Sequence, residues 1–367
     1  KWLLFSQHKK PSGVWIMAYT TIDDPTAYFQ TKLWTGNGGT QSITLDGLNN
    51  MQPDWVWIKE RSETRGHNIQ DSVRGATKYI DSRSTGAEAT VANTLTAFDA
   101  NGFSLGSYDD VNKSSQTYVA WNWKAGTTSG ITTTDSTITP AAYSFNQTSG
   151  FSIIKYVGNG TNDAKCPHGL GVAPKMIFIK DLDNTADWEC YNATNGNGKV
   201  FHLNKTNAGD ATSARWRNTS PDAVNWTMGS TTAVNGSSTD YVAYCFADVQ
   251  GYQKIGFYTG NGSGSANSGT FVYTGFSPSF VLVKNISTAE GWLLWDNKRS
   301  SFNGEGSNLS ANGTGAESTG VRVHFFSNGF QLVSSGADQN SDGQNFVYMS
   351  YAQQPFVTSG GVPATAR

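Results

Sequence analysis

One apolar segment occurs three times in the chain, each time opened by a proline and closed by a lysine. The copies are residues 53–59 (PDWVWIK), 174–180 (PKMIFIK) and 278–284 (PSFVLVK). Their inner positions are mostly β-branched or aromatic residues, without the alternation of polar and apolar types that marks a strand with one wet face. Each segment therefore predicts a strand that is buried on both faces, at the centre of a packed sheet.

The surroundings of this segment repeat as well. A Gly-Asn-Gly turn lies about 16 to 18 residues before each proline, at residues 36–38, 158–160 and 260–262. Asn-Gly supplies the positive φ angles that tight turns need. A further strand follows about 65 to 68 residues after each proline, at residues 118–123, 241–246 and 346–351, and its alternate positions are apolar in all copies. That alternation predicts a strand with one buried face.

A period of about one hundred residues predicts three domain-sized repeats, each with its own core. The expected division is an N-terminal extension (1–23), repeat 1 (24–125), a linker rich in Gly, Thr and Ser (126–149), repeat 2 (150–253), repeat 3 (254–356) and a tail (357–367). We expect the linker to be flexible, so that repeat 1 can pivot while repeats 2 and 3 pack rigidly. Met17 is a candidate start of the native chain, with residues 1–16 upstream of it.

The composition indicates an all-β protein. The chain has 40 Gly, 12 Trp, 15 Tyr and 19 Phe, and only 15% of its 367 residues are charged. Many aromatic residues and turn formers with few charges are typical of short strands joined by tight turns. The formal net charge of -2 gives no electrostatic reason to expect nucleic acid. We also expect no membrane span, since no apolar stretch is long enough.

Motifs for a metal or cofactor are not found in the sequence. The five histidines show no ligand spacing, and the two acidic loops at residues 181–184 and 338–342 do not match a calcium loop in full. The three cysteines, Cys166, Cys190 and Cys245, are expected to be small buried side chains, not a disulfide framework. No cofactor, metal or catalytic residue is therefore predicted.

An aspartate three positions before an arginine occurs in repeats 1 and 3 but not in repeat 2. The pairs are Asp71 with Arg74, and Asp296 with Arg299. We expect salt bridges that hold a loop, and a sugar-binding or catalytic pair is the alternative. Each pair is followed by a Thr-Gly-Ala-Glu string, ending at Glu88 and Glu317. These glutamates could complete the paired carboxylates of a glycosidase, which we regard as the weaker interpretation.

Tryptophans are the remaining candidates for ligand contact, because aromatic rings can stack on sugars or fill a core. Four of them lie on the predicted core strands and are expected to be structural: Trp55, Trp57, Trp121 and Trp123. Four others lie near predicted loops or strand ends and are the better candidates for a ligand-binding surface: Trp188, Trp216, Trp226 and Trp292.

Several of these strings resemble a repeat domain of unassigned function that recurs in tail-fibre-like and other structural proteins of marine bacteriophages. They include MAYTTIDDP from Met17, QPDWVWIK from Gln52, DSVRGA from Asp71, YVAWNWKAG from Tyr118 and YVAYCF from Tyr241. The resemblance implies tandem antiparallel β-sandwich domains of the jelly-roll, concanavalin-like type, related to legume-lectin, laminin-G and SPRY modules. It carries over no catalytic or binding residue.

The expected function is that of a non-catalytic structural protein on a bacteriophage virion, in a tail fibre, tail tip or capsid surface. The expected partners are other virion proteins and a host cell-surface glycan, with no nucleic acid and no membrane, and a homo-oligomer in which a trimer is favoured. Repeated weak sites on one particle would raise avidity. Two alternatives stay open: a glycan hydrolase or lyase on a jelly-roll scaffold, and a purely architectural cement protein.

Overall fold

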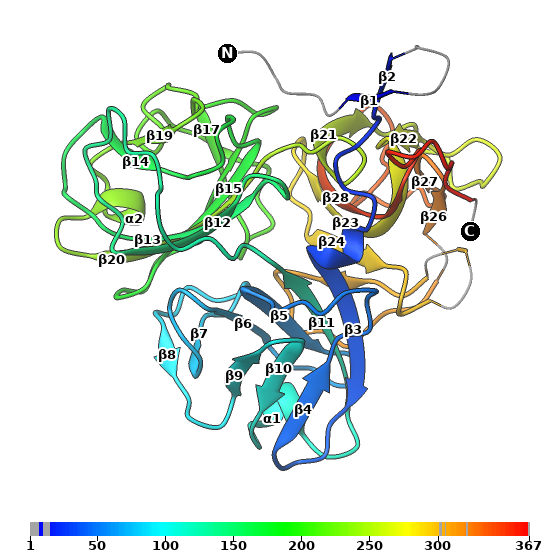
Figure 1. The fold of residues 1–367 in the computed structure, drawn as a ribbon, viewed down its shortest axis with the longest axis horizontal. Coiled ribbons are helices and arrows are strands. Elements are labelled where there is room, and N and C mark those ends of the chain that lie inside the picture. Colours follow the sequence, from blue (N-terminus) through cyan, green and yellow to red (C-terminus); the bar gives the residue numbers. More distant parts are fainter. Residues whose placement is uncertain (1–6, 10–14, 301–302, 305, 321, 366–367) are drawn as a thin grey trace.

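The computed structural model describes residues 7–9, 15–300, 303–304, 306–320 and 322–365. The strand pairs of these residues are antiparallel, which confirms the prediction of an all-β protein. We call residues 24–125, 150–253 and 254–356 modules 1, 2 and 3. Figure 1 shows them as three lobes around a common centre.

Module 1 consists of an inner and an outer sheet. The inner sheet has the order β3–β11–β5–β6, formed by Phe29–Thr35, Thr117–Trp123, Trp55–Glu60 and His67–Asp71. The outer sheet has the order β4–β10–β9, formed by Gln41–Thr44, Gly102–Leu105 and Leu95–Asp99. The smaller elements are η1 (Pro25–Ala27), the pair β7 (Lys78–Tyr79) and β8 (Ala89–Thr90), and α1 (Asp109–Asn112).

Modules 2 and 3 repeat this plan. The inner sheet of module 2 runs β12 (Ala142–Asn146), β13 (Phe151–Val157), β20 (Asp240–Phe246), β15 (Met176–Asp181), β16 (Glu189–Asn192), β17 (Lys199–His202), β18 (Asp210–Ala211). Its outer sheet pairs β14 (Ala164–Pro167) with β19 (Asn225–Met228), and α2 (Thr232–Asn235) lies between β19 and β20 in sequence. The inner sheet of module 3 has the order β21 (Gln253–Thr259), β28 (Asn345–Pro355), β23 (Phe276–Asn285), β24 (Trp292–Asp296) and β25 (Leu309–Ser310). Its outer sheet has the order β22 (Phe271–Tyr273), β27 (Gly329–Leu332) and β26 (Val323–Phe326).

Each module has a core between its two sheets. Side chains alternate between the faces of a strand, so one set from each repeated central strand meets the outer sheet of its own module. In module 1, for example, Val56 and Ile58 pack in one cluster with Phe103 and Leu105. Modules 2 and 3 have corresponding clusters. Each module thus has a cluster of buried side chains between its own two sheets.

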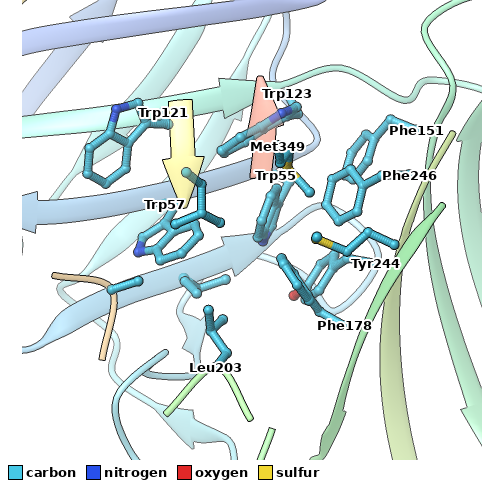
Figure 2. Packing of buried hydrophobic residues seen from close by; sticks show 14 of the residues in the cluster. Trp55, Trp57, Trp121, Trp123, Phe151, Phe178, Leu203, Tyr244, Phe246 and Met349 are labelled. Carbon is cyan, nitrogen blue, oxygen red and sulfur yellow. The ribbon is translucent and has the colours of Figure 1, made fainter. Parts of the chain in front are cut away.

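The opposite faces of the three inner sheets bury one further core that all modules share. Trp57, Phe178 and Leu282 occupy the same place in the three sheets, opposite Trp121, Tyr244 and Met349 respectively, and all six belong to one cluster. Figure 2 shows Trp57, Trp121, Phe178, Tyr244 and Met349 of this cluster converging from separate strands.

Ring contacts cross from one module to the next within this shared core. The ring centroids of Trp55 and Tyr244 lie 4.7 Å apart, those of Trp121 and Phe280 lie 5.8 Å apart. The strand predicted to be buried on one face is therefore buried on both: in β11 one face meets the outer sheet and the other meets the neighbouring modules.

The linker at residues 126–149 is not the flexible joint that we expected. It contains β12, which pairs with β13 along its whole length, and the amides of Thr137 and Ile138 both donate to the carbonyl of Lys165. Because the linker is hydrogen-bonded to module 2 and module 1 contributes to the shared core, the predicted pivoting of module 1 does not fit this structure.

The Gly-Asn-Gly turns are held by a buried asparagine in each module, a feature that the sequence alone did not reveal. Asn112, Asn235 and Asn340 each accept a hydrogen bond from the backbone amide of the turn asparagine, at 2.9 to 3.2 Å. The last glycine of each turn has a positive φ, between 66° and 71°, as predicted. A Cβ at Gly36 would lie 2.2 Å from the carbonyl oxygen of Lys113, so the turn also needs glycine for space.

The two ends of the described chain meet. β1 (Gln7–Lys9) pairs with β2 (Trp15–Met17), and the candidate start Met17 lies in β2, while most of residues 1–16 fall outside the described residues. The amide of Ser359 in the tail donates to the carboxylate of Asp23 at 2.6 Å. The hydroxyl of Thr20 donates to the carbonyl of Gln250 at 2.8 Å, which ties the N-terminal segment to the junction of modules 2 and 3.

Candidate functional site

The first predicted aspartate–arginine pair lies between modules 1 and 2. The Arg74 guanidinium donates to Asp71 at 2.5 Å and to Glu88 at 3.0 Å, and Asp71 also accepts from the hydroxyl of Tyr244 in module 2 at 2.6 Å. The Asp71 and Arg74 side chains are fully buried. The pair is therefore a buried salt bridge that links two modules.

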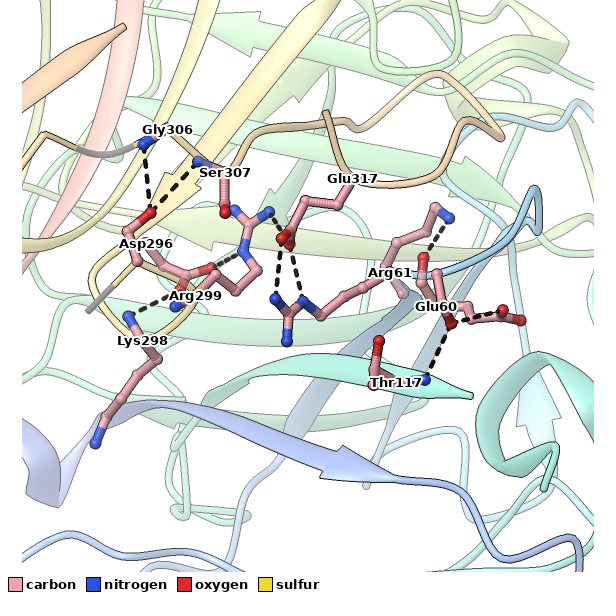
Figure 3. Close-up of polar contacts among 12 residues, drawn as sticks. Glu60, Arg61, Thr117, Asp296, Lys298, Arg299, Gly306, Ser307 and Glu317 are labelled. Atoms are coloured by element: carbon pink, nitrogen blue, oxygen red, sulfur yellow. Dashed lines mark hydrogen bonds and ion pairs between the residues drawn. The ribbon is translucent and has the colours of Figure 1, made fainter. Parts of the chain in front are cut away.

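The second pair occupies the corresponding place between modules 3 and 1. Arg299 donates to Asp296 at 2.6 Å and to Glu317 at 3.2 Å, and the indole nitrogen of Trp121 in module 1 donates to Asp296 at 3.0 Å. Figure 3 shows Glu317 between Arg299 and Arg61. The Arg61 guanidinium donates two hydrogen bonds to the Glu317 carboxylate, both at 2.9 Å. Trp121 and Tyr244 are equivalent residues, so both interfaces use the same position of the same strand.

The Thr-Gly-Ala-Glu strings make the backbone connection at these two interfaces. The amide of Glu88 donates to the carbonyl of Leu182 in module 2, and the amide of Glu317 donates to the carbonyl of Arg61 in module 1. Burial alone would raise the pKa of Glu317, but the hydrogen bond from Arg61 and the charges of Arg299 and Arg61 lower it below its usual value. The glutamates considered for a glycosidase are thus bound to arginines within interfaces.

The interface between modules 2 and 3 lacks this arrangement in the described residues. Asn192 occupies the position of Asp71 and Asp296 in the other modules. Met349 occupies the position of Trp121 and Tyr244, and its side chain has no hydrogen-bond donor. Hydrogen bonds across this interface include that of the Trp292 indole to the carbonyl of His202 and that of Lys284 to the carbonyl of Thr206, both at 3.0 Å.

The lysine that closes each repeated strand has a structural role of the same kind. Lys180 in module 2 donates to the carbonyl of Thr85 in module 1 at 3.1 Å, as Lys284 does to Thr206. Lys59 donates to the carbonyl of Glu60 at 2.6 Å. Burial lowers the pKa of all three lysines to about 8.

The four tryptophans predicted to contact a ligand are all in the interior. Trp188, Trp216, Trp226 and Trp292 are at most 1% exposed, so the prediction that they form a ligand surface is wrong for this structure. Trp216 and Trp226 fill the core of module 2. Trp188 and Trp292 belong to the shared core, where the Trp188 indole donates to the carbonyl of Asp81 in module 1. The expectation that Trp55, Trp57, Trp121 and Trp123 are structural agrees with their burial.

His67 takes the position of Trp188 and Trp292 in module 1. Its Nδ1 accepts a hydrogen bond from Trp57 at 2.7 Å, so in the neutral ring Nε2 carries the proton and donates to the carbonyl of Ser310 in module 3 at 2.9 Å. A ring N–H thus crosses to a neighbouring carbonyl at each of the three interfaces. Burial, with a smaller contribution from the charge of Lys59, lowers the pKa of His67 to about 3.

The described residues contain no cluster of three or more acidic, histidine or cysteine side chains that could hold a metal ion. Asp181, in the first acidic loop, accepts hydrogen bonds from the amides of Asp183 and Asn184 and so caps a turn. Cys166, Cys190 and Cys245 are buried free thiols, as expected. The part of the chain that is described also has no helix with the length and apolarity to cross a bilayer.

Exposed aromatic side chains gather on the outer sheet of module 3, which the sequence analysis missed. Phe271 and Tyr273 on β22 are 47% and 56% exposed, and Phe326 on β26 is half-buried beside them. The ring centroids of Phe271 and Phe326 lie 6.0 Å apart. Between them runs β27, where a Cβ on Gly329 would lie 3.0 Å from the tip of the Phe271 ring. We call Phe271, Tyr273, His324, Phe326 and Gln331 the aromatic face.

The aromatic face is specific to module 3. Its two rows, Phe271–Gln331–His324 and Tyr273–Gly329–Phe326, follow from the strand register. The same positions in module 1 carry small or polar residues in the rows Ser42–Ser104–Ala97 and Thr44–Gly102–Asp99. In module 2 they are Lys165 opposite Thr227 and Pro167 opposite Asn225. Alternation along β22 signals this face in the sequence, because Phe271 and Tyr273 flank the buried Val272.

A hollow of about 500 Å³ adjoins the aromatic face at Tyr273. Tyr19 lies in it, with its hydroxyl 3.4 Å from that of Tyr273 and bonded to the carbonyl of Gly275 at 2.8 Å. Asp248 and Lys254, which form an ion pair at 2.7 Å, also line this hollow. The site therefore combines exposed rings with hydroxyl, carboxylate and ammonium groups.

We predict that Arg299→Met lowers the free energy of unfolding by about 3–5 kcal/mol, because it leaves the buried charge of Asp296 without its partner. Urea unfolding followed by tryptophan fluorescence measures the loss. Arg217→Met is the matched control: it breaks the exposed pair with Asp163, for which we expect about 1 kcal/mol or less. Equal effects of the two substitutions would contradict the role of the buried salt bridge.

We predict that His67→Gln makes stability less sensitive to acid. An unfolded histidine titrates at about 6.5, so between that pH and about 3 the unfolded chain binds a proton that folded His67 does not bind. Stability therefore falls with falling pH, by up to about 1.4 kcal/mol per pH unit for this group. Glutamine can keep both hydrogen bonds while losing the titration. Urea unfolding at pH 7 to 4 gives the slope of the unfolding free energy against pH. In the variant this slope should be smaller by the contribution of about one proton, and an unchanged slope would refute the assignment.

Comparison with known proteins gives a family for this chain. Searches of curated proteins and of solved structures find no significant match. A family model described as a domain of unknown function (DUF7483) matches residues 24–355, which include all three modules. The chain therefore belongs to the DUF7483 family, a domain family of unknown function.

Proposed function

We propose that this protein is a non-catalytic glycan-binding module that contacts sugar through the aromatic face of module 3. The observation that carries the proposal is the exposure of Phe271 and Tyr273 on one sheet face, at positions where neither module 1 nor module 2 has an aromatic residue. A large aromatic ring in contact with water is unfavourable in free energy, because a covered ring would remove roughly 150–250 Å² of surface from water. A pyranose presents a C–H face to such rings and hydroxyl groups to their polar neighbours.

Polar groups beside the rings favour sugar over a purely apolar partner. His324 and Gln331 stand in the same row as Phe271, and the Tyr273 hydroxyl borders the hollow that holds Asp248 and Lys254. A ligand site with apolar walls and a few fixed polar groups is the usual arrangement for oriented binding. The aromatic face offers both within one surface.

We further propose a place on the surface of a bacteriophage virion, in a tail fibre, tail tip or capsid. The support is the resemblance of the repeat strings to tail-fibre-like proteins and the repetition itself. In a homo-oligomer, such as a trimer, several aromatic faces would bind one cell surface and raise avidity. Other virion proteins would then be the partners of the remaining surfaces.

Two other functions have less support. A glycan hydrolase or lyase would need a pair of carboxylates open to substrate, whereas Glu88 and Glu317 are bound to arginines at module interfaces. A purely architectural role would place the aromatic face against another virion protein. The binding experiment below separates this role from sugar recognition.

We predict that Phe271→Ala and Tyr273→Ala each weaken glycan binding by about tenfold or more, equivalent to ~1.4 kcal/mol, because each removes a stacking surface. The purified chain is screened on a glycan array, and the best hit is titrated by isothermal calorimetry. Thr44→Ala in module 1 is the matched control, since Thr44 occupies the position of Tyr273 on a polar face.

The proposal would be refuted by an array without hits, or by alanine variants that bind as well as the parent chain. Cooperative urea unfolding of each variant shows that a lost signal does not come from unfolding. Both substituted rings are exposed, so we expect changes in stability of no more than about 0.5 kcal/mol.

A further inference from the structure

The rings of the aromatic face continue beyond the outer sheet of module 3. The hydroxyl of Tyr19, in the N-terminal segment, lies 3.4 Å from that of Tyr273. The ring of Phe356, which directly follows β28, has its centroid 6.2 Å from that of Tyr19. Both residues are half-buried, so each remains partly open to solvent. Three separate stretches of the chain thus bring aromatic rings to one surface.

These rings follow one another along the surface. Phe271 and Tyr273 lie two positions apart on the same side of β22, which corresponds to about 6.6 Å along a strand. The chain then reaches Gly275, whose carbonyl accepts hydrogen bonds from the Tyr19 hydroxyl at 2.8 Å and from the Phe356 amide at 3.2 Å. We call the five rings the aromatic track: Phe326, Phe271, Tyr273, Tyr19 and Phe356.

The backbone that carries Tyr19 is held in place by its neighbours. Thr20 is only 3% exposed, and its hydroxyl donates to the carbonyl of Gln250 at 2.8 Å. Ile22 packs into the shared core. A ring on a backbone that is already fixed loses less conformational freedom when a ligand binds. Tyr19 is therefore as well prepared for ligand contact as the rings on the sheet.

Neighbouring rings of the aromatic track are steeply tilted against each other. The interplanar angle is 64° between Phe271 and Phe326, and 67° between Tyr19 and Phe356. Two rings at such an angle cannot both lie flat against the same face of one sugar. A ligand that stacks on the whole track therefore needs several sugar units in succession.

The hollow of about 500 Å³ lies beside the middle of the track, where Tyr19, Tyr273 and Gly275 are among its lining residues. Its lining also includes the ion pair of Asp248 and Lys254, and the Lys254 side chain is 42% exposed. Polar groups are thus available to the hydroxyls of a sugar unit that lies between the two tyrosines.

We propose that the ligand of the aromatic track is a linear glycan chain of several consecutive units, and not a single terminal sugar. This rests on the glycan binding proposed above and adds the extent of the ligand to it. Units over Phe271 and Tyr273 bind the most exposed rings, and the units that follow contact Tyr19 and Phe356. Each further ring that is covered adds to the affinity.

The test is an array of linear oligomers of β-1,4-linked glucose, β-1,4-linked N-acetylglucosamine, β-1,4-linked mannose and β-1,3-linked glucose, each from two to six units. The series with the strongest signal is titrated into the full chain by isothermal calorimetry. We expect the hexamer to bind about tenfold or more tightly than the dimer. Tyr19→Ala and Phe356→Ala should each weaken hexamer binding by about fivefold and leave dimer binding unchanged, whereas Phe271→Ala weakens both.

Tyr79→Ala is the matched control. Tyr79 is a half-buried tyrosine of module 1, and its hydroxyl also lies 3.4 Å from that of another tyrosine, Tyr108. Tyr19→Phe keeps the ring and removes its hydrogen bond to Gly275, so it should bind the hexamer as the parent chain does. Cooperative thermal unfolding of each variant shows that a lost signal does not come from unfolding.

Equal binding of dimer and hexamer would overturn the extended ligand, as would Tyr19→Ala and Phe356→Ala variants that bind the hexamer like the parent. If Phe271→Ala still weakens binding in that case, the aromatic face remains a glycan site for a short ligand. An array with signals for single or branched terminal sugars alone has the same meaning. No signal for any glycan would refute the proposed function together with the extended ligand.

Discussion

The structure depends on the second buried face of the three inner sheets. A sandwich needs only one face of each sheet in its core, yet Trp55, Trp57, Trp121 and Trp123 all point away from the outer sheet of module 1. Four tryptophans bury together roughly 600–1,000 Å², or about 15–25 kcal/mol at ~25 cal/mol per Å². Even half of that amount matches the net stability of a typical domain, about 5–15 kcal/mol. The modules are therefore stable as a ring, in which each one covers the others.

The polar contacts follow from this arrangement. Once three sheets face a common centre, any polar group at the rim must find its partner in the next module. Asp71 and Asp296 each accept from a tyrosine or a tryptophan of the neighbouring module, and His67 donates to a backbone carbonyl there. The interface between modules 2 and 3, with Asn192 and Met349 in place of the charged set, relies more on apolar packing. One place where module 2 departs in sequence from the other modules is thus its contact with module 3.

Local features could be predicted from the sequence because local chemistry determines them. The central strands, the Gly-Asn-Gly turns and the two aspartate–arginine pairs all follow from residue type and spacing. The shared core could not be predicted, since an apolar strand such as residues 53–59 indicates two buried faces but not what covers the second. The prediction for Trp188 and Trp292 was wrong for the same reason: they lie at the start of a strand of their own module, and a neighbouring module buries them. The finer jelly-roll, concanavalin-like assignment stays a prediction.

The candidate binding surfaces lie where the repeats differ. Outer sheets contribute to no shared core, so their solvent faces are free to vary, and the aromatic face of module 3 replaces small polar residues at equivalent positions in module 1. In this protein the repeated residues maintain the fold, and the proposed recognition uses the residues that are not repeated.

The most direct test of the shared core is to produce module 1 alone, as residues 24–125, and to measure its urea unfolding and NMR spectrum. Without modules 2 and 3, its inner sheet would expose the face that carries the four tryptophans. If the shared core is required for folding, module 1 alone shows no cooperative unfolding transition and a spectrum with poor dispersion. A monomeric, well-dispersed module 1 that unfolds cooperatively would contradict this requirement.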